Sequence, residues 1–401
     1  MKHKKKRKKD QAAHYEEFLQ EIPQVSPHCA HYYDCGGCTL QEYSYEDQLA
    51  VKLNVFKAMV EEKKMSHYFA DSEILSIASP KTSRYRQKMD YICSFGLSGL
   101  RGSSFSDVVN LSECHLIEEK SFNFYQLALK LSKELEIPDY HIRNNSGFLR
   151  YITVRRTRLG HQLVSFLTSR VGYEDALESI AQSLLKAGVD SVVWQISDGK
   201  GDTSFGTPQK NWGRAYIEED ILGYRFNLST NTFFQANQEV AEKAYSMIRD
   251  HANSFSPDSI LDLYSGTCTI GICLSKTTPK IIAVENFSPN RDMALKNFTL
   301  NKIDNIEYID SDVAEFMKTW ETTPGFAVCN PPRNGIDEKP LRKLIQLKPQ
   351  GISYLSCNPK TLLEDLAIMA RYYKIESTTI LDMFPQTKHF ETLVQLRLLE
   401  K

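Results

Sequence analysis

The spacing of apolar and polar residues divides the chain into a β-rich first part and a last part of alternating strands and helices. Two apolar-rich runs, 149–158 and 162–167, flank a Leu-Gly-His turn and predict a β-hairpin, followed by a helix at 173–187 and a strand at 191–196. After residue 257, short apolar runs at 259–264, 281–284, 306–309, 326–329 and 351–355 alternate with helical stretches. This order predicts an α+β module followed by a doubly wound α/β domain.

These patterns predict three parts along the chain. Residues 1–25 are expected to be a basic disordered tail, 26–230 a β-rich domain, and 231–401 a Rossmann-like α/β domain. Helical periodicity over 45–62 places Leu49, Leu53, Phe56 and Val60 on one face. We interpret this stretch as a packing helix, one that could pack on the last domain.

Composition is that of an ordinary globular protein, with 41% hydrophobic and 25% charged residues among 401. No apolar run approaches the ~18 residues that span a bilayer, and no signal-peptide core follows the start. We therefore expect a cytoplasmic chain with no membrane partner. Nine cysteines in a reducing compartment indicate metal binding or catalysis rather than disulfides.

A cluster of three cysteines stands near the start, at Cys29, Cys35 and Cys38, with two glycines in the last gap. Glycines let the backbone turn tightly enough for neighbouring thiolates to converge on one metal centre. The isolated Cys114 is the natural fourth ligand. This arrangement favours a four-iron cluster, and a zinc site is the alternative. Cys93 lies in an apolar strand-like run and is expected in the core.

Positive charge is concentrated in three places, although the net charge is only −1. Residues 2–9 are basic throughout and could attract phosphates, or could simply aid solubility. Two further groups fit contact with an RNA backbone, with a solvated strand face as the alternative. They are Lys81, Arg84, Arg86 and Lys88 around Tyr85, and Arg150, Arg155, Arg156 and Arg158.

The last domain carries the features of a nucleotide-type site. The strand 259–264 opens into a turn containing Gly266, and the strand 281–284 ends in Glu285, 23 residues after Asp262. A glycine turn followed by an acid on the next strand suits a ligand with ribose hydroxyls. The turn lacks the dinucleotide glycine pattern, and the strand 326–329 delivers Asn330-Pro331-Pro332, an order used by S-adenosylmethionine-dependent methyltransferases.

Cys357 stands at the carboxyl end of the strand 351–355, and a helix start follows it. Chemistry in α/β sheets is placed at this end, and a helix N-terminus lowers the pKa of a thiol, whose thiolate is the nucleophile. From this turn alone, a buried structural cysteine is the alternative.

Over roughly residues 26–401 the chain resembles the RNA uracil-5-methyltransferase family, in particular its iron–sulfur branch acting on 23S ribosomal RNA. The matching motifs, in family order, are Cys-x5-Cys-Gly-Gly-Cys, Phe-Gln-x-Asn, Asp-Leu-x-x-Gly, Asx-Pro-Pro-Arg, Ser-Cys-Asn-Pro and Phe-Glu-Thr-Leu. The resemblance implies a [4Fe-4S] cluster on Cys29, Cys35, Cys38 and Cys114, with Cys357 as nucleophile and Glu391 as general base. It also implies contacts to S-adenosyl-L-methionine from Gln235, Tyr264, Gly266, Thr269, Glu285, Asp312 and Asn330.

Some features depart from the family. Cys268 stands where a second glycine is usual, Ser265 where cysteine is frequent, and Asn330 where aspartate is common. A side chain at 268 would crowd the cofactor or require a different backbone angle. The small RNA-binding barrel of about 60 residues that precedes the cluster in many relatives is not expected, since only 28 residues, with a basic run among them, stand before Cys29.

The resemblance implies an enzyme that makes 5-methyluridine in RNA, with ribosomal RNA as the expected partner, transfer RNA as an alternative, and a monomeric chain. A base amino-group methyltransferase is a rival, but it would place an aromatic residue where Arg333 stands. A non-catalytic iron–sulfur RNA-binding protein is the other rival, which intact Cys357 and Glu391 oppose.

Overall fold

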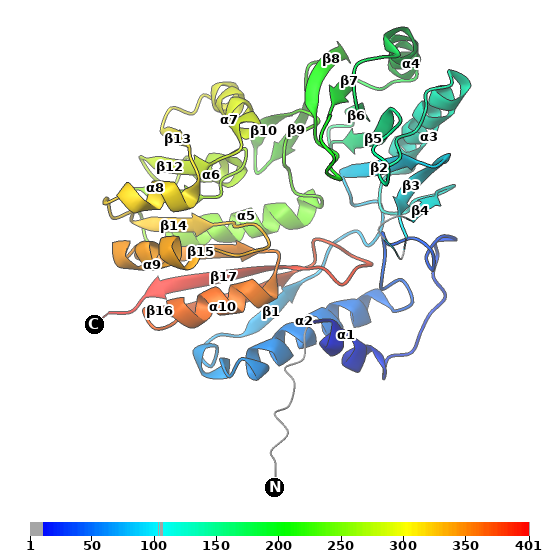
Figure 1. Ribbon diagram of the computed structural model, residues 1–401. Helices are drawn as coiled ribbons and strands as arrows, with labels where there is room; N and C mark the ends of the chain where they lie inside the picture. The colour runs from blue at the N-terminus through cyan, green and yellow to red at the C-terminus, as the bar shows by residue number, and fades with distance from the viewer. Residues whose placement is uncertain (1–10, 103, 105–106, 401) are drawn as a thin grey trace. The chain divides into compact units, whose positions relative to one another are not determined.

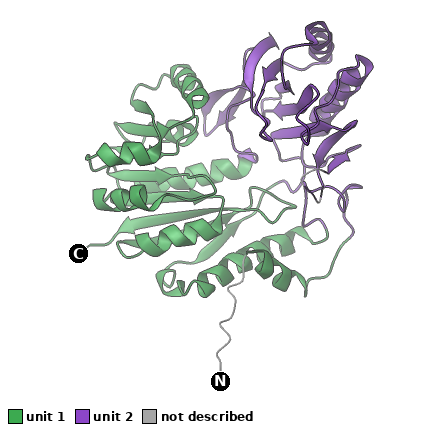
Figure 2. Ribbon diagram, in the orientation of Figure 1, with its two compact units in different colours: residues 1–25, 42–80, 239–401 green, residues 26–41, 81–238 purple. Residues whose placement is uncertain are grey.

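The computed structural model describes residues 11–102, 104 and 107–400, which form two compact units (Figure 2). Unit 1 combines residues up to 25 with 42–80 and 239–401, and unit 2 combines 26–41 with 81–238. The basic run at 2–9 lies outside the described residues. No helix in the described part of the chain has the length and apolar character needed to span a membrane.

Unit 1 is built on an eight-stranded sheet in the order β1-β16-β17-β15-β14-β11-β12-β13 (Figure 1). The bounds are β1 Ile74–Ile77, β11 Ile260–Leu263, β12 Ile281–Glu285, β13 Ile306–Asp310, β14 Phe326–Cys329, β15 Gly351–Ser356, β16 Tyr373–Leu381 and β17 Glu391–Leu398. Strand β17 runs opposite to the other seven. The predicted doubly wound sheet is confirmed, and its central strands are buried on both faces, as parallel sheets are.

The helices of unit 1 follow the strands as the pattern predicts. They are α1 Gln11–Leu19, α2 Tyr45–Glu62, the 3₁₀ turn η1 Ser66–Tyr68, α5 Gln238–Asn253, α6 Thr269–Leu274, α7 Ser288–Asn301, α8 Val313–Thr319, α9 Glu338–Leu347 and α10 Pro359–Met369. Helix α5 begins with the last residue of unit 2, Gln238. Ser44 caps the start of helix α2, and its hydroxyl accepts a hydrogen bond from the Asp47 N–H.

The amino-terminal segment differs from the sequence prediction in two respects. Residues 11–19 of the expected disordered tail form helix α1, in which His14 and Tyr15 are buried. Residues 42–80 belong to unit 1 rather than to a continuous 26–230 domain, because β1 pairs with β16, about 300 residues away. The buried face of α2 is also rotated from the predicted one: Val51, Val55, Phe56, Met59 and Val60 are buried, together with Gln48 and Lys52.

Unit 2 is a seven-stranded sheet in the order β4-β3-β2-β5-β6-β7-β8, with a separate β9–β10 ribbon. The bounds are β2 Lys88–Ser94, β3 Leu97–Arg101, β4 Val108–Asn110, β5 Leu149–Arg156, β6 Gln162–Thr168, β7 Ser191–Ile196, β8 Thr207–Gly213, β9 Ile217–Ile221 and β10 Tyr224–Leu228, with helices α3 Glu119–Glu134 and α4 Glu174–Lys186. The predicted hairpin is β5–β6. Apolar side chains of α3, α4 and the sheet form one core, which also buries Cys93.

Candidate active site

Several predicted site residues lie at one edge of the unit 1 sheet. The strands β11 to β15 run parallel, so their carboxyl ends meet at that edge, where open α/β sheets bind ligands. The residues placed there are Tyr264, Glu285, Asp312, Asn330 and Cys357. Gly266 and Thr269 lie in the turn that follows β11 and at the start of α6. Gln235 belongs to unit 2.

Cys357 and Glu391 are brought together by the register of two neighbouring strands. Strands β15 and β17 are antiparallel, and Ser356 at the end of β15 pairs with Thr392 near the start of β17. The residue after Ser356 and the residue before Thr392 are therefore neighbours at the sheet edge. Cys357 is half-buried, whereas Glu391 is only 5% exposed. The structure thus sets a thiol beside a buried carboxyl group.

Arg333 completes this group of ionisable side chains. Its guanidinium interacts with both the Cys357 thiol and the Glu391 carboxyl group. The Arg333 carbonyl accepts hydrogen bonds from Asn358 Nδ2 at 2.7 Å and Thr361 Oγ1 at 3.2 Å. The loop after β14 is therefore fastened to the turn that carries Cys357.

Burial and the Arg333 guanidinium shift the pKa values of Cys357 and Glu391 in opposite directions. Burial, followed by the Glu391 carboxyl group, raises the pKa of Cys357, and Arg333 partly offsets this. Burial raises the pKa of Glu391 to about 8, again opposed by Arg333. The lowered thiol pKa expected from the helix N-terminus is therefore not found, because desolvation and a neighbouring carboxylate outweigh it.

The turn after β11 is tied to the end of β12. Glu285 accepts the Gly266 N–H at 2.9 Å with one carboxylate oxygen, and the N–H groups of Asn286 and Phe287 at 3.0 Å with the other. The Tyr308 hydroxyl donates to the Gly266 carbonyl at 2.7 Å. The backbone of the glycine turn is held rigidly beside an acidic side chain, as a ribose-binding edge requires.

Cys268, the unusual residue in this turn, points away from the open edge. It is fully buried, has a φ of 58°, and its Sγ lies 4.0 Å from Asp262 Oδ2. The left-handed conformation disfavours a non-glycine residue, but the thiol occupies space beneath the turn rather than above it. Position 268 therefore adopts the different backbone angle expected from the sequence, with its thiol packed in the interior.

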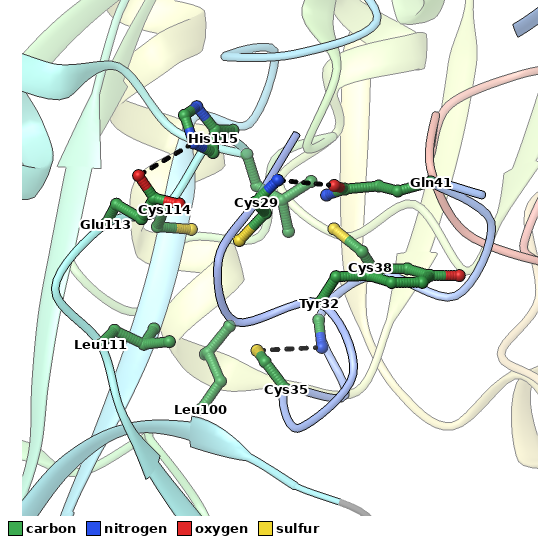
Figure 3. A pocket seen from close by; sticks show the side chains of 12 residues that line it. Cys29, Tyr32, Cys35, Cys38, Gln41, Leu100, Leu111, Glu113, Cys114 and His115 are labelled. Atoms are coloured by element: carbon green, nitrogen blue, oxygen red, sulfur yellow. Dashed lines mark hydrogen bonds and ion pairs between the residues drawn. The ribbon is translucent and has the colours of Figure 1, made fainter. Parts of the chain in front are cut away.

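Four cysteines of unit 2 surround one cavity (Figure 3). Cys29, Cys35 and Cys38 come from one loop and Cys114 from the segment after β4. The two segments are joined by a hydrogen bond from the Ala30 N–H to Glu113 Oε1 at 2.7 Å, and the Gly37 N–H donates to Cys35 Sγ at 3.4 Å. Among the described residues, no three histidine, cysteine or acidic side chains converge on the position of a single metal ion.

Comparisons with known proteins agree with this geometry. The model of the family described as tRNA (Uracil-5-)-methyltransferase matches residues 214–399. An uncharacterized RNA methyltransferase of Caldanaerobacter subterraneus is 32% identical over 94% of this chain and 86% of its own length. The chain belongs to the RNA uracil-5-methyltransferase family. It is an S-adenosylmethionine-dependent RNA uracil-5-methyltransferase.

Two archaeal relatives of this methyltransferase have a named substrate. The tRNA (uracil(54)-C(5))-methyltransferase of Pyrococcus furiosus is 28% identical over 93% of this chain and 86% of its own length. The crystal structure of the corresponding Pyrococcus abyssi enzyme in complex with S-adenosyl-L-homocysteine covers 90% of this chain and 86% of its own, with 26% identity and a TM-score of 0.77. The mixed α/β fold with a methyltransferase domain is thereby confirmed.

Three arginines that the sequence suggested for RNA contact are buried in this methyltransferase. Arg150 donates to the carbonyls of Ser197 at 2.8 Å and Gly199 at 2.7 Å, and Arg155, 1% exposed, donates to those of Ser229 and Thr232, both at 2.7 Å. Arg156 pairs with Glu118 at 2.6 Å. All eight residues of β5 are buried, so these guanidinium groups satisfy internal carbonyls and a carboxylate rather than face solvent.

The group around Tyr85 is also more internal than predicted. The Tyr85 ring is 4% exposed and packs in the core of unit 2, so it offers no face for base stacking. Lys88 pairs with Asp90 at 3.1 Å, and Arg84 pairs with Glu119 at 3.3 Å on the surface. The alternation of basic and other residues predicted an exposed strand face. The sequence alone does not show which side chains pack against that face.

Arg333 is the site residue that the sequence interpretation used only to exclude a rival reaction. A basic residue directly after Asn330-Pro331-Pro332 was the available signal. Because the chain turns at these prolines toward the β15 edge, a cation at this position reaches the thiol and the carboxyl group.

Proposed function

We propose that Cys357 and Glu391 carry methyl transfer to carbon 5 of a uridine in RNA, through a covalent Cys357–uracil intermediate. The pairing of Ser356 with Thr392 supports this most directly, since it places a nucleophile and a buried carboxyl group at adjacent strand ends.

Each group has one task in this reaction. The Cys357 thiolate adds to carbon 6 of uracil, which makes carbon 5 nucleophilic enough to take the methyl group of the sulfonium, leaving S-adenosylhomocysteine. The Glu391 carboxylate then removes the proton from carbon 5, and the electrons of that C–H bond restore the double bond as the C6–S bond breaks. The thiolate is regenerated, and one proton is released overall. Arg333 stabilises both anions.

The elevated pKa of Glu391 suits its role. A carboxyl group with a pKa near the working pH is a stronger base than an ordinary glutamate and is still ionised in part at neutral pH.

For S-adenosyl-L-methionine we propose the seven residues named from the sequence: Gln235, Tyr264, Gly266, Thr269, Glu285, Asp312 and Asn330. Six of them belong to unit 1. Three backbone N–H groups donate to the Glu285 carboxylate beside the glycine turn. The free lone pairs of that carboxylate would accept hydrogen bonds from the ribose hydroxyls. Asp312 caps helix α8 through its Oδ1, which leaves Oδ2 toward Asn286.

We further propose that Cys29, Cys35, Cys38 and Cys114 hold a [4Fe-4S] cluster. The four thiols come from two separate segments of the chain and line one cavity, which supports a shared cofactor at this place. One tetrahedral zinc would need sulfurs about 3.8 Å apart, given a Zn–S bond of about 2.3 Å. In a cluster each cysteine binds a different iron, so the four thiols need to surround the group and need not meet at one point.

Ribosomal RNA is the substrate to test first, because the cysteine motif resembles that of the 23S ribosomal RNA branch. Transfer RNA is the second candidate, and the named Pyrococcus relatives favour it. In either case the target uridine must leave its stack, at a few kcal/mol, which favours a loop over a helix.

A covalent trap tests the reaction. Incubating the protein with S-adenosyl-L-methionine and 5-fluorouridine-containing 23S ribosomal RNA or transfer RNA should give a denaturation-resistant adduct, because fluorine cannot be removed as a proton. The adduct should vanish in Cys357→Ala, and sequencing the trapped RNA identifies the substrate. Cofactor binding without an adduct on either RNA would refute the proposal.

Anaerobic purification tests the cluster. We expect about four iron and four sulfide per chain with visible absorption, and loss of both in Cys114→Ser but not in Cys93→Ser. One zinc per chain after purification in the presence of both metals would overturn the assignment.

A further inference from the structure

The connection between β16 and β17, residues 382–390, is mostly buried although it is a loop, with only His389 exposed. Asp382, Met383, Gln386, Thr387 and Phe390 are each at most 7% exposed. Connecting segments normally lie on the surface, because a buried loop must satisfy its own backbone polar groups. This loop ends directly at Glu391, and Leu381 before it pairs with Glu391. Contacts that hold this loop in place therefore also hold the backbone of Glu391, from which its side chain extends.

An ion pair from helix α2 holds the beginning of the loop. Lys52 Nζ donates to Asp382 Oδ1 at 2.7 Å and to the Phe384 carbonyl at 3.1 Å. Both charged side chains are 0% exposed. Burying such a pair costs more in desolvation than a well-packed apolar pair of the same volume would, so its presence is not explained by stability alone.

Two reciprocal hydrogen bonds hold the middle of the loop. Gln48 Nε2 donates to Gln386 Oε1, and the Gln386 N–H donates to Gln48 Oε1, both at 2.9 Å. Gln386 has a φ of 68°, a left-handed conformation that must be held by its surroundings. One turn of α2 thus presents Gln48 and Lys52 side by side to one loop.

A third contact holds the end of the loop. The Tyr15 hydroxyl of α1 donates to the Lys388 carbonyl at 2.8 Å, three residues before Glu391. The beginning, middle and end of the loop are therefore each fastened to the amino-terminal helices.

We propose that Gln48 and Lys52 are positioning residues that hold the Glu391 carboxylate at the place where it removes the carbon 5 proton. This inference rests on the proposed function, in which Glu391 acts only after the methyl group has been transferred. Loosening the loop should therefore slow release of the product RNA, because a displacement of about 1 Å at a reacting group can cost about a hundredfold. Addition of Cys357, which lies on a different strand end, should be unaffected.

The test compares Gln48→Met with the double variant Gln48→Met/Gln386→Met. Methionine keeps the length and helix propensity of glutamine but makes neither hydrogen bond. The double variant also removes the side-chain amide of Gln386, whose oxygen accepts from Gln48, while the backbone N–H of residue 386 loses its acceptor in both variants. The matched control is Val55→Ala, at a fully buried position on the same helix that makes no polar contact to the loop in the described structure.

Three quantities are measured for each folded variant: multiple-turnover methylation, the amount of denaturation-resistant adduct on ordinary uridine RNA, and the rate of adduct formation on 5-fluorouridine RNA. Both Gln48 variants should lose at least about tenfold in kcat, accumulate the ordinary-RNA adduct, and trap fluorinated RNA at the wild-type rate. Val55→Ala should lower stability without accumulating adduct.

Normal turnover in the Gln48 variants would overturn the proposal. So would a loss of turnover matched by an equal loss of fluorinated adduct, since that result means general damage to the site. If the wild-type protein itself forms no fluorinated adduct, the proposed function fails and the positioning role falls with it, a result distinct from the other two.

Discussion

Gly271 lies directly against Cys268: a Cβ atom at position 271 would approach Cys268 Sγ to 2.4 Å and Asp262 Oδ2 to 3.0 Å. The glycine at 271 and the thiol at 268 therefore share one small space beside the turn that follows β11.

The shared space predicts coupled substitutions. Gly271→Ala alone should destabilise the protein by about 1–3 kcal/mol, because the surroundings are close-packed. In a Cys268→Gly background the same change should cost much less, since the thiol is gone and a glycine tolerates the left-handed φ of position 268. Urea unfolding of the four proteins gives the coupling energy. Equal costs in both backgrounds would show that the thiol does not occupy this space.

Glu391 should make stability depend on pH. Its pKa is about 8 in the folded protein, against 4.5 for an ordinary glutamate, so the folded state keeps a proton that the unfolded state has lost between these values. Wild-type stability should therefore fall as pH rises from about 5 to 8 through this group. Glu391→Gln removes the effect, and its Tm should exceed that of wild type increasingly toward pH 9. Parallel Tm curves for the two proteins would contradict the assigned pKa.

Arg333 should set the pH at which the enzyme works. For a base that must be ionised and that acts after methyl transfer, kcat rises with pH and levels off above the pKa of Glu391, about 8. Arg333→Met removes the cation that lowers the pKa of both Cys357 and Glu391, so the rising limb should move to higher pH. At pH 7 we expect at least about a tenfold loss, as one pKa unit corresponds to a factor of ten. A pH profile that keeps its midpoint would exclude this electrostatic role.

Arg150 should matter for folding and not for RNA. Replacing it by methionine leaves the carbonyls of Ser197 and Gly199 without their donor and should destabilise unit 2 by about 1–3 kcal/mol. The slope of log affinity against log salt for RNA should stay unchanged, because no phosphate contact is lost. Arg84→Met, at a surface position, is the comparison. A reduction of the slope by about one in Arg150→Met would restore the RNA-contact interpretation.

Strands and helices that are marked by residues close together in the sequence were predicted correctly. A strand that forms by pairing with a segment far away in the sequence was not predicted. The strand before Cys357 and the hairpin β5–β6 are confirmed because their apolar runs and turn residues lie within a few positions of each other. Strand β1 is four residues long and pairs only with β16, so no local signal marked it. The arginines of β5 alternate as on a half-exposed strand, and only the loops that cover them show that they are internal.

The candidate site was predictable where a motif carries its residues. Cys357 and Glu391 were named from two motifs, and the strand register then brings them to adjacent positions. Gln48 and Lys52 were not named, because a polar residue on a helix is usually solvent-exposed and nothing near them in sequence indicates a buried loop. The pKa of Cys357 was expected to fall, since sequence shows the helix start but not the burial.

The pairing of β1 with β16 has a consequence for how the protein is made. Ile74 leaves the ribosome about 300 residues before its partner Thr378, a delay of roughly 15–60 s at ordinary rates of synthesis. Throughout that interval β1 lacks its partner strand, whereas all of the chain that forms unit 2 has been made once residue 238 is reached, about 140 residues before Thr378. Unit 2 can therefore complete its fold during translation, before strand β16, on which β1 of unit 1 pairs, has been made.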